Sequence, residues 1–411
     1  MTTARVAPTA PIQGTERMDT LDAVRGAAVL GILLVNILPL SGHAFVPPEA
    51  HLALPLASWH EPLFRLMFVF VETKFYSMFS FLFGVGFSVF IGRASARGAD
   101  AIRLFKRRLI GLLLIGLVHT TLIWMGDILA TYAVIGFALI PFVGKSDRTV
   151  IRWAVTMLLL PIGLYALILG IAAIFSPQGV HYGAGEVPAS GVPPFLEPAV
   201  HSFASGTYIE VVKGNIIFTL AGVARRLALM FFPRVFGMFL LGFYVGRRNM
   251  FAEIDRHTLL LRRVFLWGTV IGLPLSYAGA LLEGNSMAAP NVLGFVETTV
   301  KSIGAPLLSL AYAAGLCLLF QRARALRRAF AAAGQMALTN YLMHSIVGVA
   351  IFYGMGLGLF GRVPLAIVVA GAIAFFALQT VLSRLWLSHA AFGPAEWVWR
   401  MFTYRRRVPL F

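Results

Sequence analysis

The sequence predicts an all-α polytopic membrane protein with about ten transmembrane helices and both termini in the cytoplasm. Apolar runs of about 20 residues, long enough to cross a bilayer, recur throughout the 411-residue chain. Hydrophobic residues make up 59% of the chain and charged residues only 12%, whereas about a quarter of the residues in soluble domains are charged. The basic residues form short clusters between the apolar runs, as the positive-inside rule requires.

The sequence predicts ten spans. They cover residues 22–40, 63–92, 109–125, 128–144, 153–175, 231–246, 264–283, 300–320, 332–355 and 364–387. Run 63–92 is too long for one upright helix, so we expect it to be tilted or broken near Gly84 and Gly86. Loops assigned to the cytoplasmic side, such as 93–108 and 321–331, are rich in arginine. The net charge of +17 therefore reflects membrane topology and argues against a nucleic-acid partner.

The chain divides into two membrane halves with short polar ends. The predicted regions are a disordered cytoplasmic tail at 1–16, an N-terminal half at 17–230, a C-terminal half at 231–404 and a basic tail at 405–411. Residues 41–62 and 176–206 are rich in proline and glycine and are predicted to be long outside loops. Residues 207–230 fit an amphipathic helix that lies along the outer interface.

The first predicted span begins with an acid and a base, Asp22 and Arg25. Because they lie three residues apart, they share one face of the helix and can pair with each other. Together with Arg107 and Arg108 of the next inside loop, they could hold an anionic, phosphate-bearing cofactor. The alternative is that the pair only anchors the helix at the membrane surface.

Polar or amphipathic side chains also recur in the middle and outer half of the predicted spans. They are Asn36, Glu72, Lys74, His119, Trp124, Asp127, Asn340 and His344. One hydrated substrate pocket open to the outside would explain them together, because an isolated buried polar group is costly. Simpler explanations are that Lys74 snorkels, that Asp127 caps the following helix, and that Asn340 and His344 form interhelical hydrogen bonds.

Several kinds of chemistry are not indicated by the sequence. It contains no glycine-rich phosphate loop, no Gly-x-Ser-x-Gly elbow and no His-Glu-x-x-His zinc pair. Its one cysteine, Cys317, excludes an internal disulfide and a cysteine-rich metal site. We therefore expect no metal cofactor.

Five stretches of the chain resemble the YeiB family of bacterial membrane proteins, whose function is unknown. They are residues 17–36, 74–86, 119–129, 334–341 and 392–400. The resemblance covers nearly the whole chain. It implies a multi-pass protein of the bacterial inner membrane, with a C-terminal half of the YeiB type.

The opening Leu21-Asp22-x-x-Arg25-Gly26, followed by Asn36, is also similar to the wider transmembrane acyltransferase superfamily. That group includes the lysosomal enzyme that acetylates heparan glucosamine. The resemblance implies transfer of an acyl group from cytoplasmic acyl-coenzyme A to a lipid or glycan acceptor at the outer face. Asn36 matches the first-span asparagine of that enzyme and would hold the acyl carbonyl or its oxyanion.

The leading hypothesis is therefore a membrane-embedded acyltransferase. A neutral histidine, namely His43, His60 or His119, would be the general base, and Asp127 or Glu72 would orient it. The alternative is a transporter or exporter of a small molecule or lipid-linked substrate, with the same charges forming its path. A third hypothesis is a non-catalytic lipid- or partner-binding module. All three expect membrane lipids as partners, and all are compatible with a homodimer.

Overall fold

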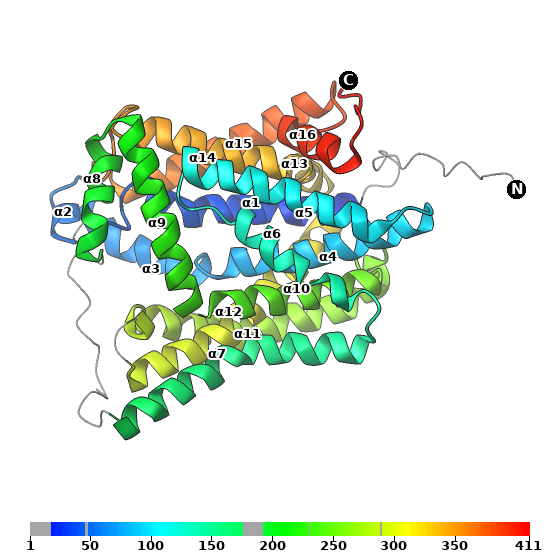
Figure 1. Ribbon diagram of the computed structural model, residues 1–411, viewed down its shortest axis with the longest axis horizontal. Coiled ribbons are helices and arrows are strands. Elements are labelled where there is room, and N and C mark those ends of the chain that lie inside the picture. Colours follow the sequence, from blue (N-terminus) through cyan, green and yellow to red (C-terminus); the bar gives the residue numbers. More distant parts are fainter. Residues whose placement is uncertain (1–17, 46–47, 176–191, 229, 288–289) are drawn as a thin grey trace, which may run out of the picture.

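The structure, a computed structural model, describes residues 18–45, 48–175, 192–228, 230–287 and 290–411. Most of its helices run side by side along the long axis of the molecule (Figure 1). The predicted tail at 1–16 and half of the predicted loop 176–206 lie outside the described residues. In chain order the helices are α1 (Asp19–Leu40), α2 (Pro48–Leu52), α3 (His60–Phe70), α4 (Lys74–Ala96), α5 (Ala101–Val118), the π-helical turn η3 (His119–Ile123), α6 (Leu129–Phe137), α7 (Asp147–Phe175), α8 (Glu197–Ser205), α9 (Tyr208–Ala228), α10 (Phe231–Arg247), α11 (Thr258–Leu281), α12 (Val292–Arg322), α13 (Arg324–Gln335), α14 (Ala337–Phe352), α15 (Leu365–Leu387) and α16 (Pro394–Tyr404).

The predicted class, an all-α polytopic membrane protein, is confirmed, but the described helices provide fewer spans than predicted. Six helical segments are long and apolar enough to cross a membrane, or up to eight if each of two sharply bent helix pairs is one span. The predicted span 109–125 is not among these segments, because α5 has four basic residues in its first half and is too charged to count as a membrane span. The predicted span 128–144 is also not among them, because α6 is only nine residues long and cannot cross a membrane.

Two predicted spans are broken at positions that their sequences do not mark. The run 63–92 is divided into α3 and α4 at residues 71–73, where Thr73 has a φ of 65°. The run is therefore broken, but not near Gly84 and Gly86, where the sequence had suggested a break. A Cβ on Gly84 would lie 2.0 Å from the carbonyl oxygen of Phe239, so this glycine permits close contact between α4 and α10. The run 332–355 is divided into α13 and α14, which meet at an angle of 75° at Met336.

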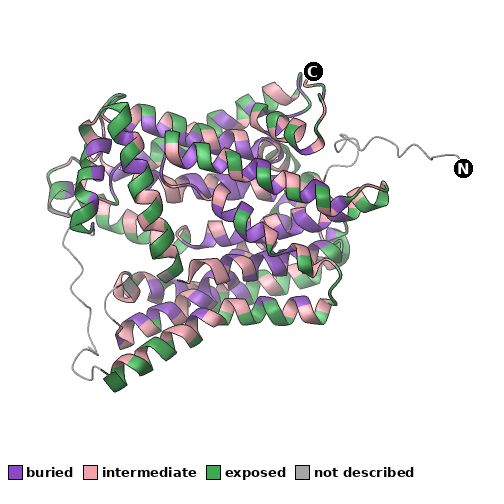
Figure 2. Ribbon diagram, in the orientation of Figure 1, coloured by how far each residue is buried: buried purple, intermediate pink, exposed green. Residues whose placement is uncertain are grey.

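Helices α1 and α4 form the buried centre of the molecule. α1 packs against α13, α4, α14 and α15, and α4 packs against α10 and α12. By contrast, only 6% of the residues in the 18-residue apolar stretch of α7 are buried inside the protein, and 28% of those in the corresponding stretch of α15 (Figure 2). In a membrane, these outer helices would present their apolar side chains to lipid.

Helices α1 and α13 cross with their backbones in direct contact. A Cβ on Gly334 would lie 1.8 Å from the carbonyl oxygen of Asp22. A Cβ on Gly26 would lie 2.1 Å from that of Phe330. Only glycine fits at these two positions, as is typical of close helix crossings in membranes. The crossing fixes the first turns of α1, with Asp22 and Arg25, against the end of α13.

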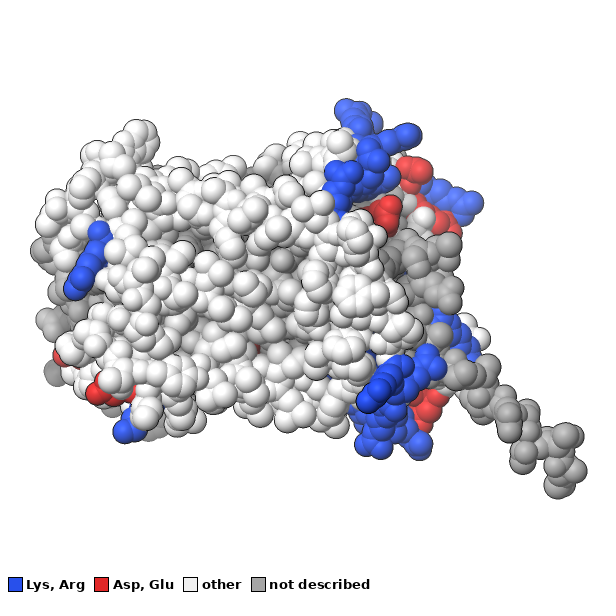
Figure 3. Space-filling model, turned by 90° about the horizontal axis from the view of Figure 1, so that it is seen from above, with Lys and Arg blue, Asp and Glu red and all other residues white. Residues whose placement is uncertain are grey.

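The charged side chains gather at one end of the long axis. Figure 3 shows most lysines and arginines of the displayed face at this end, which we call the basic end. It includes Arg103 at the start of α5 and Arg247 at the end of α10. α1 begins and the chain terminates at the same end (Figure 1). This asymmetry agrees with the predicted cytoplasmic location of that end.

The glycine crossing leads to a first prediction. Replacing Gly334 with alanine should destabilise the protein by about 1–3 kcal/mol, because the added methyl group overlaps the backbone of α1. The matched control is Gly92→Ala on α4, where a Cβ would have no neighbour within 4 Å. Thermal unfolding in detergent should show a lower Tm only for Gly334→Ala. Equal Tm values for the two variants would contradict the tight crossing.

The orientation leads to a second prediction, which single-cysteine labelling can test. The native Cys317 is only 2% exposed, so it should give little background with a membrane-impermeant thiol reagent. In intact cells the reagent should label Leu357→Cys, because Leu357 is 70% exposed in the loop between α14 and α15. It should label Arg103→Cys only after the cells are opened. Labelling of Arg103→Cys in intact cells would reverse the topology.

Candidate functional site

A cavity of about 260 Å³, which we call the inner pocket, lies among α1, α4, α5, α6, α14 and α16 towards the basic end. Its charged lining consists of Arg25, Arg93, Arg108, Arg400, Asp22 and Glu396. Three of the four residues predicted to bind an anionic cofactor, Asp22, Arg25 and Arg108, are therefore brought together in one lining. Arg107 does not belong to this lining; it is half-buried on α5.

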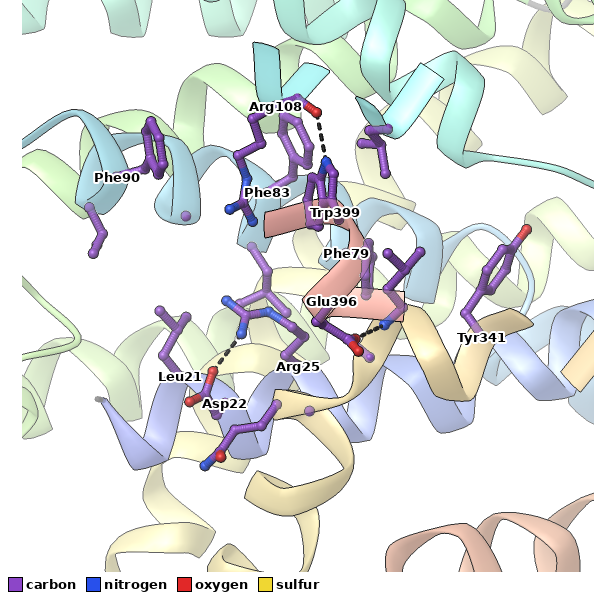
Figure 4. A pocket seen from close by; sticks show the side chains of 18 of the residues that line it. Leu21, Asp22, Arg25, Phe79, Phe83, Phe90, Arg108, Tyr341, Glu396 and Trp399 are labelled. Carbon is purple, nitrogen blue, oxygen red and sulfur yellow. Dashed lines mark hydrogen bonds and ion pairs between the residues drawn. The ribbon is translucent and has the colours of Figure 1, made fainter. Parts of the chain in front are cut away.

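The two arginines nearest the centre of the inner pocket are held by different partners. Arg25 donates a hydrogen bond of 2.5 Å to Asp22, as their spacing predicted. The guanidinium carbon of Arg108 lies 3.9 Å from the ring centre of Trp399 and 5.4 Å from that of Phe90. Figure 4 shows Arg25 and Arg108 directed into the same space from α1 and α5. Such a pair of fixed guanidinium groups suits phosphate or carboxylate groups.

The rest of the inner pocket is apolar and reaches far from the charged residues. Along α1 its lining extends from Asp22 to Ile32, and along α4 from Arg93 to Phe79. At 1.5 Å per residue these stretches are about 15 Å and about 21 Å long. At about 260 Å³ the cavity is smaller than the typical ligand pocket of about 300–1,000 Å³. Its size and polarity suit an extended apolar arm whose anionic group lies at the arginines.

A hydrogen-bonded Ser–His–Asp chain lies beyond the apolar end of the inner pocket. Nδ1 of His119 lies 3.0 Å from Oδ1 of Asp127, and Nε2 of His119 lies 2.9 Å from Oγ of Ser345. All three residues are buried, and His119 and Ser345 have no exposed surface. Oδ2 of Asp127 accepts from the amide of Ala130 at 2.7 Å, so the aspartate also caps α6, as the simpler explanation predicted.

The backbone near His119 is unusual. α5 ends at Val118, and His119 begins the π-helical turn η3, a form that is rare and frequently found at functional sites. Trp124 follows this turn; it is 1% exposed and packs edge-on to His119 at 6.3 Å between ring centres. The turn thereby returns the chain so that Asp127 faces the histidine eight residues before it.

One residue connects the inner pocket to this buried chain. Tyr341 lines the pocket, and its ring centre lies 5.2 Å from that of His119. Helix α1 packs against α14: Ile32 belongs to the same apolar cluster as Tyr341, and Leu40 adjoins Gly348. Asn36 lies four residues from both Ile32 and Leu40, so it is at about the depth of Ser345.

The residues predicted to line one outer pocket belong to separate groups of contacts in the described part of the chain. Asn340 and His344 bond to α15 instead: Asn340 Nδ2 donates to Ser383 Oγ at 3.1 Å, and His344 Nε2 lies 2.8 Å from Gln379 Oε1. These are the interhelical hydrogen bonds of the simpler explanation.

Glu72 and Lys74 belong to a third, separate group. Lys74 is 4% exposed and donates to the carbonyl oxygen of Phe68 at 2.7 Å, so it does not snorkel. Both residues line a small cavity together with Glu283 and Lys301. Lys301 forms ion pairs with Glu283 and Glu297. This group is a partly buried charge network between α4, α12 and the end of α11.

The histidines of the predicted loop 41–62 form a fourth group. His43 and His60, both candidates for the general base, stack with His51. Burial, followed by the nearby charges of His51 and His60 when protonated, lowers the pKa of His43 to about 3. Neither His43 nor His60 bonds to Asp127 or Glu72 among the described contacts. Of the three candidate bases, only His119 has the predicted carboxylate partner.

Sequence reasoning missed Ser345 and the partners on α15. Serine is frequent in membrane helices, so Ser345 gave no signal of its own. Gln379 and Ser383 did give one, because two polar residues four apart in an apolar run share one helix face. Glu396 and Trp399 of α16 belong to the stretch 392–400, which the sequence analysis used only for its resemblance to the YeiB family. A glutamate beside aromatic residues in such a stretch is unusual and could have indicated a site.

Fold and sites together define an all-α, multi-pass membrane protein with an amphipathic pocket near its basic end. Comparison with known proteins identifies the family to which it belongs. The chain is 33% identical over 97% of both chains to the "Uncharacterized protein YxaH" of Bacillus subtilis (strain 168). It is also 33% identical, over 97% of both chains, to the "Uncharacterized 39.9 kDa protein in amylase 3'region" of Bacillus acidopullulyticus. It is 28% identical to the "Uncharacterized protein YeiB" of Escherichia coli (strain K12), over 96% of this chain and 98% of YeiB.

Residues 245–406 match the family described as "Protein of unknown function (DUF418)". The chain therefore belongs to the YeiB family, as its motifs indicated. No solved structure matches it. The matched region contains α14 and α16, which contribute Ser345 and the aromatic wall beside Arg108.

Proposed function

We propose that the protein is a membrane-embedded acyltransferase that uses a cytoplasmic acyl-coenzyme A donor and an acceptor at the outer face. The most direct support is the inner pocket, which extends from arginines at the basic end to Tyr341 in contact with His119. A cationic site suited to phosphates would thus lie at one end of an apolar passage, and the Ser–His–Asp chain at the other. Acyl transfer across a membrane needs this order of groups.

The donor would bind with its phosphates at the arginines. Arg25 and Arg108 would hold these groups, and the pantetheine and acyl arm would lie along the apolar part of the pocket. The arm would approach Ser345 from the side of Tyr341. The Tyr341 ring lies in the way in this conformation, so transfer requires that it move aside.

The first chemical step would form an acyl-serine. Ser345 Oγ forms a bond to the acyl carbon, and the thioester C–S bond breaks. His119 accepts the serine proton at Nε2 and passes it to the departing sulfur, so that coenzyme A leaves as the free thiol. Asp127 holds Nδ1 of the imidazole and stabilises its protonated form.

The second step would release the acyl group to the acceptor. A hydroxyl or amine of the acceptor forms a bond to the acyl carbon, and the ester bond to Ser345 breaks. His119 moves the acceptor proton to Ser345 Oγ, which restores the starting state. Asn36, at about the same depth, would donate to the developing oxyanion in both steps.

A second candidate function is transport, supported by the partly buried charge network at Glu72, Lys74, Glu283 and Lys301. Ionisable groups inside membrane helices often mark substrate or proton paths. A transporter would use this network and would form no covalent intermediate. The formation of an acyl-enzyme therefore separates the two functions.

The donor site leads to a third prediction. Arg25→Ala and Arg108→Ala should each weaken the binding of coenzyme A at least 10-fold, because each removes a guanidinium from the pocket lining. The matched control is Arg103→Ala, an arginine of α5 whose side chain is 72% exposed. Isothermal titration of the detergent-purified protein would measure the dissociation constants. Equal constants for all variants would exclude the inner pocket as the donor site.

Exchange of the paired charges tests whether Arg25 binds the donor or only anchors α1. The double variant Asp22→Arg, Arg25→Asp keeps an ion pair at the same spacing. We expect it to fold with normal Tm and to bind coenzyme A poorly, since the guanidinium has moved by three positions. Full binding by the double variant would assign the pair to helix anchoring alone.

The Ser–His–Asp chain leads to a fourth prediction. After incubation with acetyl-coenzyme A, mass spectrometry should find one acetyl group on the peptide that contains Ser345. His119→Ala should lower the rate of this acylation at least about 100-fold, and Ser345→Ala should abolish it. Ser309→Ala is the control, because Ser309 is equally buried and only donates to the carbonyl of Pro306. Undiminished acylation in Ser345→Ala would refute the covalent step.

A further inference from the structure

Three histidines form a compact cluster at the end of the molecule opposite the basic end. His43 lies in the turn after α1, His51 on α2, and His60 at the first residue of α3. One ring nitrogen from each lies within 4.8 Å of those of the other two. His43 and His51 are each only 4% exposed, and His60 is partly exposed. Three segments of the chain thus place imidazoles around one point.

The hydrogen bonds of His43 identify which of its nitrogens is available. The hydroxyl of Ser41 donates to the carbonyl oxygen of Leu38 at 3.3 Å, so its single proton is already used. The same oxygen lies 2.8 Å from Nδ1 of His43, and when Nδ1 carries the proton it donates to this oxygen. In this tautomer the lone pair is on Nε2. That atom is buried and makes no hydrogen bond of standard geometry with the described residues, although the backbone of Val363 also lies near His43.

Packing alone does not explain these residue types. The rings of His51 and His60 stack at 4.1 Å between centroids, and those of His43 and His51 at 5.0 Å. Phenylalanine would stack equally well without leaving a polar atom in an apolar setting. Burial of an unsatisfied nitrogen is unfavourable. An electron-pair acceptor between the rings would remove that cost.

We propose that His43, His51 and His60 bind a divalent transition metal ion, Zn²⁺ in the first place, at the outer end of the protein. An all-imidazole set suits zinc, and three histidines with one position left for water is a known zinc arrangement. The N···N distances in a tetrahedral site with Zn–N bonds of 2.0–2.1 Å are about 3.3 Å. The nitrogens need to approach by at most about 1.5 Å, which side-chain rotation provides.

The hydrogen bond from His43 to Ser41 fits this role. Metal-bound histidines almost always donate their second ring nitrogen to an oxygen, which fixes the tautomer and the ring orientation. Ser41 is therefore a positioning residue for the metal site. The turn that contains it is itself fixed, because the amide of Gly361 donates to the Ser41 carbonyl at 2.8 Å.

The metal would connect three segments of the chain at the outer end of the protein. It would join the end of α1 to α2 and to the first turn of α3, which is partly exposed. The open coordination position would face the outer side, where a water molecule or an anionic group of a ligand could bind. This assignment replaces the expectation of a metal-free protein and the role of His43 or His60 as general base.

Zinc uptake by the full-length protein tests the proposal. The detergent-purified protein is treated with a chelator, incubated with Zn²⁺ and desalted, and its metal content is measured by inductively coupled plasma mass spectrometry. We expect about one zinc per chain for the parent. His60→Ala should lower the affinity at least 10-fold, and Ser41→Ala should lower it by about 10-fold. His201→Ala, a change of an exposed histidine on α8, should leave it unchanged.

A second measurement separates metal loss from misfolding. Co²⁺ bound by three imidazoles and water should give the intense visible absorption of a tetrahedral site in the parent and in His201→Ala. It should be absent in His60→Ala, whose metal-free Tm should equal that of the metal-free parent because His60 is partly exposed. Zinc should raise the Tm of the parent and of His201→Ala but not that of His60→Ala. Equal zinc uptake by the parent and by His60→Ala, or no uptake by the parent, would overturn the proposal.

Discussion

Contact between the backbones of α1 and α13 determines where the inner pocket lies. With glycine at positions 26 and 334, the two helices approach until a Cβ on either residue would overlap the other backbone. α13 then meets α14 at 75°, which places the first turn of α14 beside α1. Oε1 of Glu396 accepts from the amides of Leu338 and Thr339 in that turn, and this contact fixes α16. Trp399 of α16 finally covers Arg108.

The structure separates two kinds of buried polar contact that look alike in the sequence. His344 with Gln379 joins two neighbouring helices, is remote from the inner pocket lining and fits a purely structural role. His119 is just as buried, but both of its ring nitrogens have side-chain partners from different elements. It also adjoins the pocket through Tyr341. Both histidines are buried and hydrogen-bonded, so the number of their partners and their surroundings distinguish them, not their burial.

Short-range spacing accounts for what the sequence could predict. The Asp22–Arg25 pair, the common face of Asn340 and His344, and the cap at Asp127 all follow from helix periodicity over three or four residues. The contact between His119 and Ser345 joins residues 226 positions apart, and no local pattern specifies it. The break at 71–73 was missed for a related reason. Its sequence, Val71-Glu72-Thr73, contains no glycine or proline, so tertiary packing must impose it.

The π-helical turn at His119–Ile123 makes the register of this region sensitive to chain length. A π-helical turn accommodates one residue more than an α-helical turn, and such turns therefore correspond to single-residue insertions in a helix. Deleting one residue would let α5 continue with ordinary geometry. Every side chain beyond the deletion would then rotate by about 100° relative to α5. The alignment of His119 with Asp127 thus depends on the number of residues between them as well as on their identities.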